Sequence, residues 1–141
     1  MDPERLRAEG WAVVESEGFA GLVGPLWVRG TGSERIFGFT AAPQHGNRNG
    51  VVHGGMLMSF GDNGLGHAAR DALSGALCAT IQFQMQFTAP VRIGDFVVCR
   101  AEIVRRSLTL IFLRGLLSVR GKTVASADGV WAVLQRKPRS R

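Results

Sequence analysis

One carboxylate, Asp62, lies within a mostly apolar stretch that runs from Gly54 to Leu73. The pattern of this stretch is helical, and an acid among so many apolar residues is unfavourable unless it is paired or functional. Gly54 and Gly55 begin the stretch, where the first N–H groups of a helix lack intrahelical partners and attract negative charge. These residues suit attack on a carbonyl carbon: the carboxylate attacks or activates water, and the N–H groups bind the oxygen that becomes negative.

The polar residues of this region each have a structural interpretation beside the functional one. Asp62 can cap a kink or pair with a structural arginine, although a lone acid amid this much apolar surface favours function. His53, next to the two glycines, can position a substrate or bind backbone groups where the loop meets the helix. Asn47 can contact a substrate or only form a turn. His45 and His67 are interpreted as structural or solvent-exposed residues.

The helix that must carry Asp62 is predicted to be largely buried, because its apolar residues spread around most of its surface. They are Met56, Leu57, Met58, Phe60, Leu65, Ala68, Ala69 and Ala72. Three glycines in the helix, Gly61, Gly64 and Gly66, have poor intrinsic helix propensity, so they indicate close approach by a sheet. Long, flexible methionines beside Phe60 also suggest an adaptable apolar lining for a pocket.

The residues before this helix predict a short helix, a hairpin and a loop. Pro3 to Glu15 fits an N-terminal helix with Asp2 as its cap. Leu22 to Arg29 and Ile36 to Thr40 fit two strands that are joined by a glycine-rich turn. Residues 41–52 carry turn residues and little apolar periodicity, and a loop of this length often has a functional role.

The residues after the helix predict four longer antiparallel strands, at 77–88, 96–104, 108–119 and 123–134. In the first of these, Thr80, Gln82, Gln84 and Gln86 alternate with Ile81, Phe83, Met85 and Phe87. This period of two predicts one polar face and one buried face, and we interpret Gln84 and Gln86 as exposed. One antiparallel sheet wrapped around the helix is the simplest arrangement that buries it, so we expect an α+β fold. We expect a single domain over 1–141, with its core at about 19–135 and a basic tail at 136–141.

Composition limits the partners and the location. The 141 residues carry a formal net charge of +6, which favours anionic partners. The N-terminus lacks the apolar core of a signal peptide, and no later stretch is long and apolar enough to span a membrane, so we predict a cytoplasmic protein without a membrane partner. Cys78 and Cys99 lie in apolar runs without metal-ligand spacing, which predicts reduced packing residues and no metal site.

A set of short motifs carries a resemblance to a known family. Asn47, then His53-Gly54-Gly55, Asp62, the run from Gln86 to Pro90 and Gly94-Asp95 follow one another at characteristic spacings. Together they resemble the hotdog-fold acyl-CoA thioesterases of the phenylacetate-pathway type. The likeness extends from about Leu26 to Leu134.

The resemblance implies an activity and a role for each residue. Asp62 would be the nucleophile or general base, and Gly54 would donate the oxyanion-binding N–H. Asn47 and His53 would position the thioester or water, and Thr80 takes a place often held by a hydroxyl residue. We further expect Gly55, Gln82 and Arg48 to bind substrate. The substrate would be a small, aryl or medium-chain acyl-CoA, so coenzyme A enters as part of the substrate and no separate cofactor is expected.

Helix geometry predicts a site shared between two subunits. Gly54 and Asp62 are eight residues apart, which separates their backbones by roughly 12 Å along the axis. A thioester carbonyl needs its oxygen about 3 Å from the oxyanion donor and its carbon similarly close to the attacking group. One helix cannot satisfy both distances, whereas a two-fold dimer can bring Gly54 of one chain to Asp62 of its mate. The resemblance implies the same arrangement, as a dimer or a tetramer.

Three other functions are weighed against hydrolysis. The first is a non-catalytic acyl-CoA-binding module on the same fold, which has little reason to keep an acid facing a thioester. The second is the (R)-specific enoyl-CoA hydratase of the hotdog fold, whose D-x(4)-H spacing Asp62 and His67 share; on a regular helix, however, these side chains lie about 140° apart. The third is nucleic-acid binding, for which the strands lack an aromatic and basic pattern. The positive charge suits the phosphates of coenzyme A, with loose candidates at Arg48, Arg70, Arg92, Arg105 and Arg106.

Overall fold

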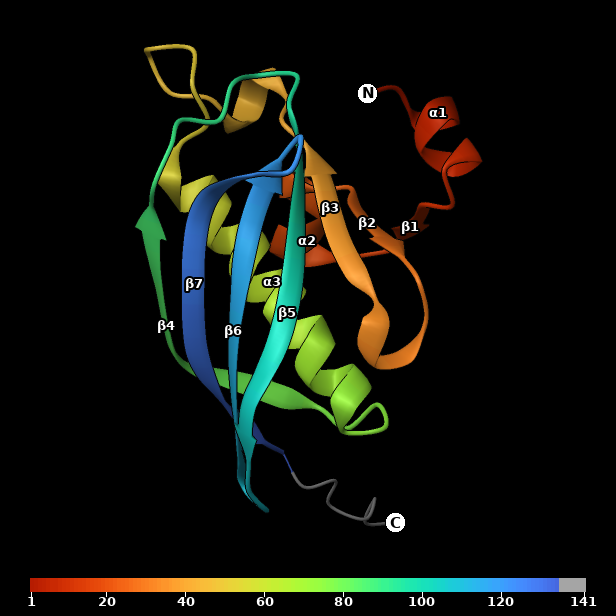
Figure 1. Ribbon diagram of the computed structural model, residues 1–141, viewed down its shortest axis with the longest axis vertical. Coiled ribbons are helices and arrows are strands. Elements are labelled where there is room, and N and C mark those ends of the chain that lie inside the picture. The colour runs from red at the N-terminus through yellow and green to blue at the C-terminus, as the bar shows by residue number, and fades with distance from the viewer. Residues whose placement is uncertain (135–141) are drawn as a thin grey trace.

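A computed structural model describes residues 1–134 of the chain. Seven antiparallel strands form one sheet in the order β1-β2-β3-β5-β6-β7-β4, and this sheet curves around the long helix α3 (Figure 1). The strands are β1 (Ala12–Val14), β2 (Leu26–Arg29), β3 (Ile36–Thr40), β4 (Cys78–Phe87), β5 (Phe96–Arg106), β6 (Leu110–Val119) and β7 (Lys122–Val133). The helices are α1 (Pro3–Ala8), α2 (Gly18–Val23) and α3 (Gly54–Ala72), with short 3-10 turns at Gly32–Glu34 and Pro43–His45. The predicted antiparallel sheet around one central helix is confirmed, while the predicted tail at 136–141 lies outside the described residues.

Glycines allow α3 to lie close to the sheet. A Cβ atom at Gly61 would stand 2.7 Å from Met85 Cε and 2.9 Å from Phe83 Cζ, so only glycine fits there without a shift of β4 side chains. Gly64 faces Phe37 of β3, where a Cβ would be 3.5 Å from the Phe37 Cβ. The predicted close approach of helix and sheet is confirmed.

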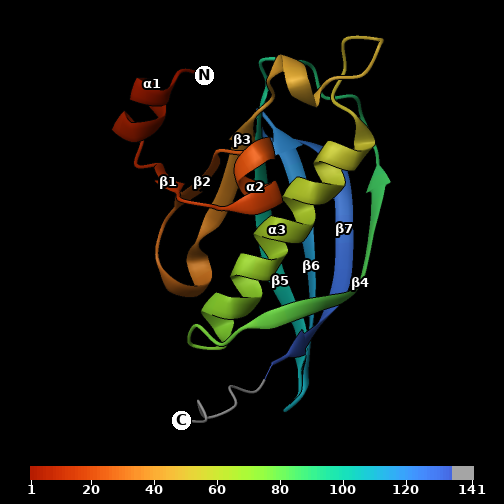
Figure 2. The ribbon, with the colours of Figure 1, turned by 180° about the vertical axis from the view of Figure 1, so that it is seen from behind.

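One side of α3 is not covered within a single chain. Leu57, Phe60 and Leu65 are buried against the sheet, whereas Asp62 and Asn63 are only half-buried. Figure 2 shows this side from behind, with α3 in front of the sheet and α2 beside it. The prediction of a largely buried helix is confirmed, and Asp62 and Asn63 lie on its least covered side.

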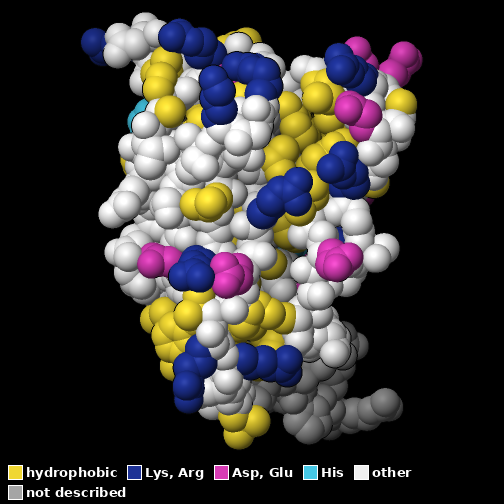
Figure 3. Space-filling model, in the orientation of Figure 1, with side chains coloured by type: hydrophobic (Ala, Val, Ile, Leu, Met, Phe, Trp, Pro, Cys, Tyr) yellow, Lys and Arg dark blue, Asp and Glu magenta, His cyan; other side chains and the backbone are white. Residues whose placement is uncertain are grey.

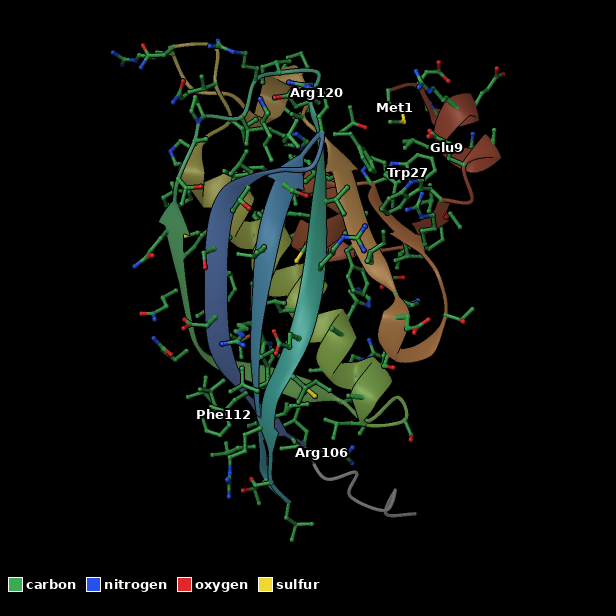
Figure 4. All side chains as sticks on the ribbon, in the orientation of Figure 1. Met1, Glu9, Trp27, Arg106, Phe112 and Arg120 are labelled. Carbon is green, nitrogen blue, oxygen red and sulfur yellow. The ribbon has the colours of Figure 1, made fainter. Side chains whose placement is uncertain are left out.

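The predicted N-terminal helix is too long. α1 is capped by the Asp2 side chain, as expected, but it ends at Ala8 because Gly10 turns the chain with a left-handed φ of +92°. Residues 12–14 then form β1 instead of helix, paired antiparallel with β2. Helix α1 lies on the outer side of the sheet, where Leu6, Trp11, Trp27 and Ile36 form a second apolar cluster. Figure 4 shows Trp27 beside α1.

The predicted strand at 22–29 is partly wrong as well. Leu22 and Val23 belong to α2, and the strand begins only at Leu26. Pro25 lacks a backbone N–H and cannot continue a helix, so α2 ends before it and the chain becomes extended. The predicted hairpin is confirmed from there, since β2 and β3 pair antiparallel with Trp27 opposite Gly38.

Strand β4 is irregular at the point where it passes Asp62. It lies at the edge of the sheet and pairs with β7, with a register shift between Thr80 and Gln82 that makes Ile81 an extra residue. The bulge turns Thr80 to the helix side, the side that Phe83 and Met85 also occupy. Alternation then places Gln82 on the opposite face. The predicted common face of Thr80 and Gln82 is therefore wrong.

The apolar side of β4 is also less buried than predicted. Ile81 is 59% exposed and Phe87 is 51% exposed in the single chain. The other three long strands match their predicted positions within about two residues at each end. Among the helices within residues 1–134, none has the length and apolar character needed to cross a membrane.

Candidate active site

Asp62 lies in the middle of α3 on its uncovered side. Its Oδ1 accepts a hydrogen bond of 2.7 Å from Thr80 Oγ1 on β4. A hydrogen bond to a carboxylate is stronger than one between neutral groups, so it fixes the orientation of the acid. Within residues 1–134 no other partner contacts the Asp62 carboxylate by hydrogen bond or ion pair. A carboxylate held by one oxygen and free at the other can act as a base or a nucleophile.

Two pockets meet at Asp62. The first, which we call the apolar pocket, has a volume of about 210 Å³. Its walls are Phe19, Ala20 and Val23 of α2, Gly24, Pro25, Leu26 and Phe39, and Met56, Ser59, Phe60, Asp62 and Asn63 of α3. The predicted apolar lining is confirmed for Met56 and Phe60. The sequence does not predict the contribution of α2, because the strand expected at 22–29 includes residues 22 and 23 of this helix.

The second pocket, which we call the polar pocket, also has a volume of about 210 Å³ and lies between α3 and strands β4 and β7. It is lined by Asp62, Asn63, Gly66, His67, Arg70, Cys78, Thr80 and Trp131. Asp62 and Asn63 thus separate an apolar space from a polar one. This arrangement suits a reaction in which an apolar group lies on one side of the acid and a polar group on the other.

The beginning of α3 presents one N–H group to solvent-accessible space. His53 caps the helix, and its Nδ1 accepts a hydrogen bond of 2.8 Å from the Gly55 N–H. The Gly54 N–H, in contrast, has no hydrogen-bond partner among residues 1–134. Gly54 lines a third pocket of about 460 Å³ together with Val52, Leu57 and residues 87–91. The structure therefore gives His53 a structural contact and leaves Gly54 as the available donor.

The remaining predicted residues do not gather around Asp62 within one chain. Asn47 is exposed, and its Oδ1 accepts a hydrogen bond of 2.8 Å from the Asn49 N–H, which is the turn-forming role. Arg48 is exposed in the same loop, and Gln82 is exposed on the outer face of β4. Gly54 and Gly55 lie two turns of helix away from Asp62. One chain brings together only Asp62 and Thr80 of the predicted set.

The other two histidines have structural surroundings. His45 is buried, with Nδ1 accepting from the Ala42 N–H at 2.9 Å and Nε2 lying 2.7 Å from the Val23 carbonyl oxygen. His67 packs against Phe37 with 5.8 Å between ring centroids. Burial lowers the pKa of His67, and the nearby Arg35 and Arg70 lower it further. These surroundings favour the structural interpretation of both histidines. They give no support to a hydratase in which Asp62 and His67 act as a pair.

Basic side chains gather on the outer face of the sheet. An open groove of about 690 Å³ runs between α1 and the strands β5 and β6, and its lining includes Arg5, Arg29, Arg100 and Arg120. Figure 3 shows Lys and Arg side chains around apolar surface on this face. Glu102 pairs here with Arg114, which holds the pKa of the Glu102 carboxyl below its usual value. Of the predicted phosphate-binding candidates, only Arg70 lines a pocket next to Asp62.

Comparisons with known proteins all point to one family. The model of the thioesterase superfamily matches residues 49–125, more than half of the chain. The acyl-CoA thioester hydrolase YciA of Salmonella typhimurium is 36% identical over 93 residues, which cover 66% of this chain and 68% of that protein.

Solved structures agree with this assignment. A phenylacetic acid degradation-related protein from Ralstonia eutropha JMP134 has 28% identity and a TM-score of 0.75, covering 92% of this chain and 97% of its own. A conserved protein from Pseudomonas aeruginosa has 25% identity and a TM-score of 0.77, covering 84% and 95% respectively. The predicted resemblance is confirmed: this chain belongs to the thioesterase superfamily and is a thioester hydrolase with the hotdog fold.

Proposed function

We propose that this protein hydrolyses small, aryl or medium-chain acyl-CoA thioesters to the free acid and coenzyme A. The observation that carries the proposal is the Asp62 carboxylate, oriented by Thr80 and bordering an apolar pocket. The pocket offers an acyl or aryl group a place beside the acid. The related protein YciA is named an acyl-CoA thioester hydrolase. This name supports coenzyme A as the thiol part of the substrate.

The chemistry requires one bond to form and one to break. Asp62 attacks the thioester carbon directly, or takes a proton from a water molecule that attacks it. The carbonyl oxygen becomes negative and binds the Gly54 N–H, which has no other partner among the described residues. When the carbonyl re-forms, the carbon–sulfur bond breaks and the thiolate of coenzyme A leaves with the bonding electrons, later taking up a proton. Attack by the carboxylate would add a second step, in which water hydrolyses the mixed anhydride.

A dimer with shared sites is part of the proposal. Gly54 and Asp62 are about 12 Å apart along one helix, too far for a single carbonyl group. The edge strand β4 supports dimerisation because an unpaired strand edge readily pairs with another copy, and its exposed Ile81 and Phe87 would be covered. Antiparallel pairing of two β4 strands would place the two α3 helices side by side, with each Gly54 toward the Asp62 of the partner. Pairs of dimers can then form a tetramer.

A panel of acyl-CoA esters tests the proposed activity. We expect the purified protein to release free thiol from at least one short, aryl or medium-chain acyl-CoA, as measured with a thiol-reactive dye. Matched oxygen esters of the same acyl groups serve as a control for the leaving group. If the protein binds acyl-CoA without releasing thiol from any member, it is the alternative, a non-catalytic binding module, and the proposed hydrolysis is wrong.

Replacing Thr80 by Val should lower kcat about 10- to 100-fold, because a hydrogen bond to a charged group is worth about 1.5–3 kcal/mol. Valine keeps the shape of the side chain and removes the hydroxyl that donates to Asp62. The matched control is Thr80→Ser, which keeps the hydroxyl and should retain most of the activity. Equal rates for the Val and Ser variants would show that the Thr80 hydroxyl is not needed.

A further inference from the structure

The end of the molecule at which strands β5 and β6 join exposes several large apolar side chains. Leu108, in the turn between these two strands, is 87% exposed. Four more apolar residues at this end are each about half exposed: Leu77, Ile103, Val104 and Leu134. We call these five residues the hairpin end. Exposed aliphatic side chains that gather in one place are unfavourable in water, so they indicate a surface that a partner covers.

Backbone hydrogen bonds bring the residues of the hairpin end together. The Val133 N–H donates to the Thr109 carbonyl oxygen at 2.9 Å, which holds the end of β7 against the turn that contains Leu108. The Leu134 N–H donates to the Leu77 carbonyl oxygen, also at 2.9 Å. Figure 1 shows the β5–β6 hairpin projecting at the lower end of the sheet. The exposed apolar residues therefore lie at one projecting end of the molecule.

The sequence around the hairpin end is basic and contains no acid. Residues 73–86, residues 103–113 and the chain from residue 129 onward include no Asp or Glu. They include six basic residues: Arg105, Arg106, Arg136, Lys137, Arg139 and Arg141. Figure 4 shows Arg106 at this end of the sheet, and Figure 3 shows Lys and Arg side chains beside apolar surface there. The surface thus combines aliphatic side chains with positive charge.

The arginines of the hairpin are available to an outside anion. Within residues 1–134, neither Arg105 nor Arg106 forms an ion pair with an acid. Arg106 Nη1 donates to the Ala72 carbonyl oxygen at 2.8 Å, which leaves the charge of its guanidinium unbalanced. The acids that precede two of the basic segments, Asp71 and Glu102, are each ion-paired with another arginine. An anionic partner would therefore meet positive charge on both sides of Leu108.

A second copy of this chain does not suit such a surface. In a two-fold interface the hairpin ends of both chains would face each other, and like charges brought together in this way are unfavourable. Nucleic acid offers phosphates, but its bases bind to aromatic side chains, and the five exposed residues are aliphatic. An anionic phospholipid bilayer offers phosphates for arginine and an apolar interior for leucine.

We propose that the hairpin end binds the surface of an anionic phospholipid bilayer. Leu108 enters the boundary between the headgroups and the acyl chains, and Arg105 and Arg106 bind lipid phosphates. Such contact needs no helix that spans the bilayer. It replaces the expectation of no membrane partner, which rested on the lack of a long apolar stretch and of a signal peptide. The proposal does not depend on the proposed hydrolysis, because none of these residues lies near Asp62 in the candidate site.

Vesicles of defined composition test the proposal. We expect the full chain to sediment with vesicles made of phosphatidylcholine and phosphatidylglycerol in equal parts, and not with vesicles of phosphatidylcholine alone. Binding should weaken as the salt concentration rises, because salt ions screen the attraction between arginine and lipid phosphate. Equal binding to both kinds of vesicle, or binding to neither, would overturn the inference.

Substitutions of Leu108 test the apolar part of the contact. Leu108→Ser should weaken vesicle binding about tenfold, because it removes most of the apolar side chain that enters the bilayer. Leu108→Trp should bind more tightly, since tryptophan favours the headgroup region. The matched control is Leu22→Ser, which changes a leucine on α2 that is 78% exposed and should bind like the wild type. Circular dichroism and Tm check folding. Equal binding by Leu108→Ser and Leu22→Ser would show that Leu108 does not enter the bilayer.

A matched pair of arginine variants tests the charged part. Arg105→Gln should weaken vesicle binding about fivefold, the usual effect of one basic residue at an anionic membrane. Arg92→Gln removes the same charge from an exposed position that precedes the other end of β5 and should leave vesicle binding unchanged. Equal losses in the two variants would mean that the net charge of the whole protein, and not the hairpin end, attracts the vesicles.

Light scattering without lipid separates a bilayer from a second copy of the chain. We expect Leu108→Ser to have the same molar mass as the wild type. A smaller assembly in Leu108→Ser would show that the hairpin end is an interface between copies and would overturn the inference. Binding of a DNA duplex by a protein that does not bind the anionic vesicles would overturn it as well, and would assign the surface to nucleic acid.

Discussion

An Asp62→Asn variant should fold normally and lose thioesterase turnover at least a hundredfold. Asparagine has the same shape as aspartate, and its side-chain oxygen can still accept the hydrogen bond that Thr80 donates to Asp62. It cannot take a proton from water, and it does not attack a carbonyl carbon as a carboxylate does. General-base assistance alone contributes about 10²–10⁴ in rate, so its removal should appear mainly in kcat.

The measurement is kcat and KM on the preferred acyl-CoA, with circular dichroism and Tm as the check on folding. Asp128→Asn is the matched control, because Asp128 is an exposed acid on β7 that alternation places on the other face from Trp131. That control should keep its activity. A folded Asp62→Asn protein with turnover near that of the Asp128→Asn control would disprove the catalytic role of Asp62.

The second large effect is expected from Gly54→Pro, which deletes the N–H that would bind the oxyanion. Proline is favoured at the first position of a helix, where its missing N–H costs no intrahelical bond. The residue before it must be extended, and His53 already has φ −61° and ψ 136°. We therefore expect an intact helix and a loss of about 10²–10³ in kcat, the usual effect of removing one oxyanion donor.

Gly54→Ala separates the lost N–H from the added side chain. A Cβ atom at this position would lie 3.1 Å from Phe87 Cζ, so the Phe87 ring must move slightly in both variants. Only the proline variant lacks the donor. Turnover that falls equally in Gly54→Ala and Gly54→Pro would show that crowding of Phe87, and not loss of the N–H, is responsible.

Mixing two inactive chains tests whether a site is shared. A heterodimer of Asp62→Ala and Gly54→Pro chains has one site with both defects and one site with neither, if each site takes Gly54 from one chain and Asp62 from the other. With random subunit exchange half of the dimers are heterodimers, so activity should return to about a quarter of the wild-type value. Verified heterodimers that stay inactive, or a fully active monomer, would exclude the shared site.

Local patterns in the sequence were enough to predict most of the fold. The period of two over residues 77–88 and the apolar stretch at 54–73 correspond to β4 and α3 almost residue for residue. The predicted ends of helices and strands were wrong where a single glycine or proline ends an element. Gly10 ends α1 early, and Pro25 separates α2 from β2, although the apolar residues around both would fit a longer element.

The sequence by itself determined that an acid lies on a buried helix whose first residues are His53, Gly54 and Gly55. Spacing along one helix fixes that Gly54 and Asp62 are about 12 Å apart, whatever surrounds them. Tertiary structure alone decided what Asp62 contacts. The bulge at Ile81 turns Thr80 toward Asp62 and Gln82 away from it, and strand pairing brings Trp131 beside Thr80. Such contacts depend on register and on side chains far apart in the chain, and a one-residue shift in register reverses the face of every residue that follows.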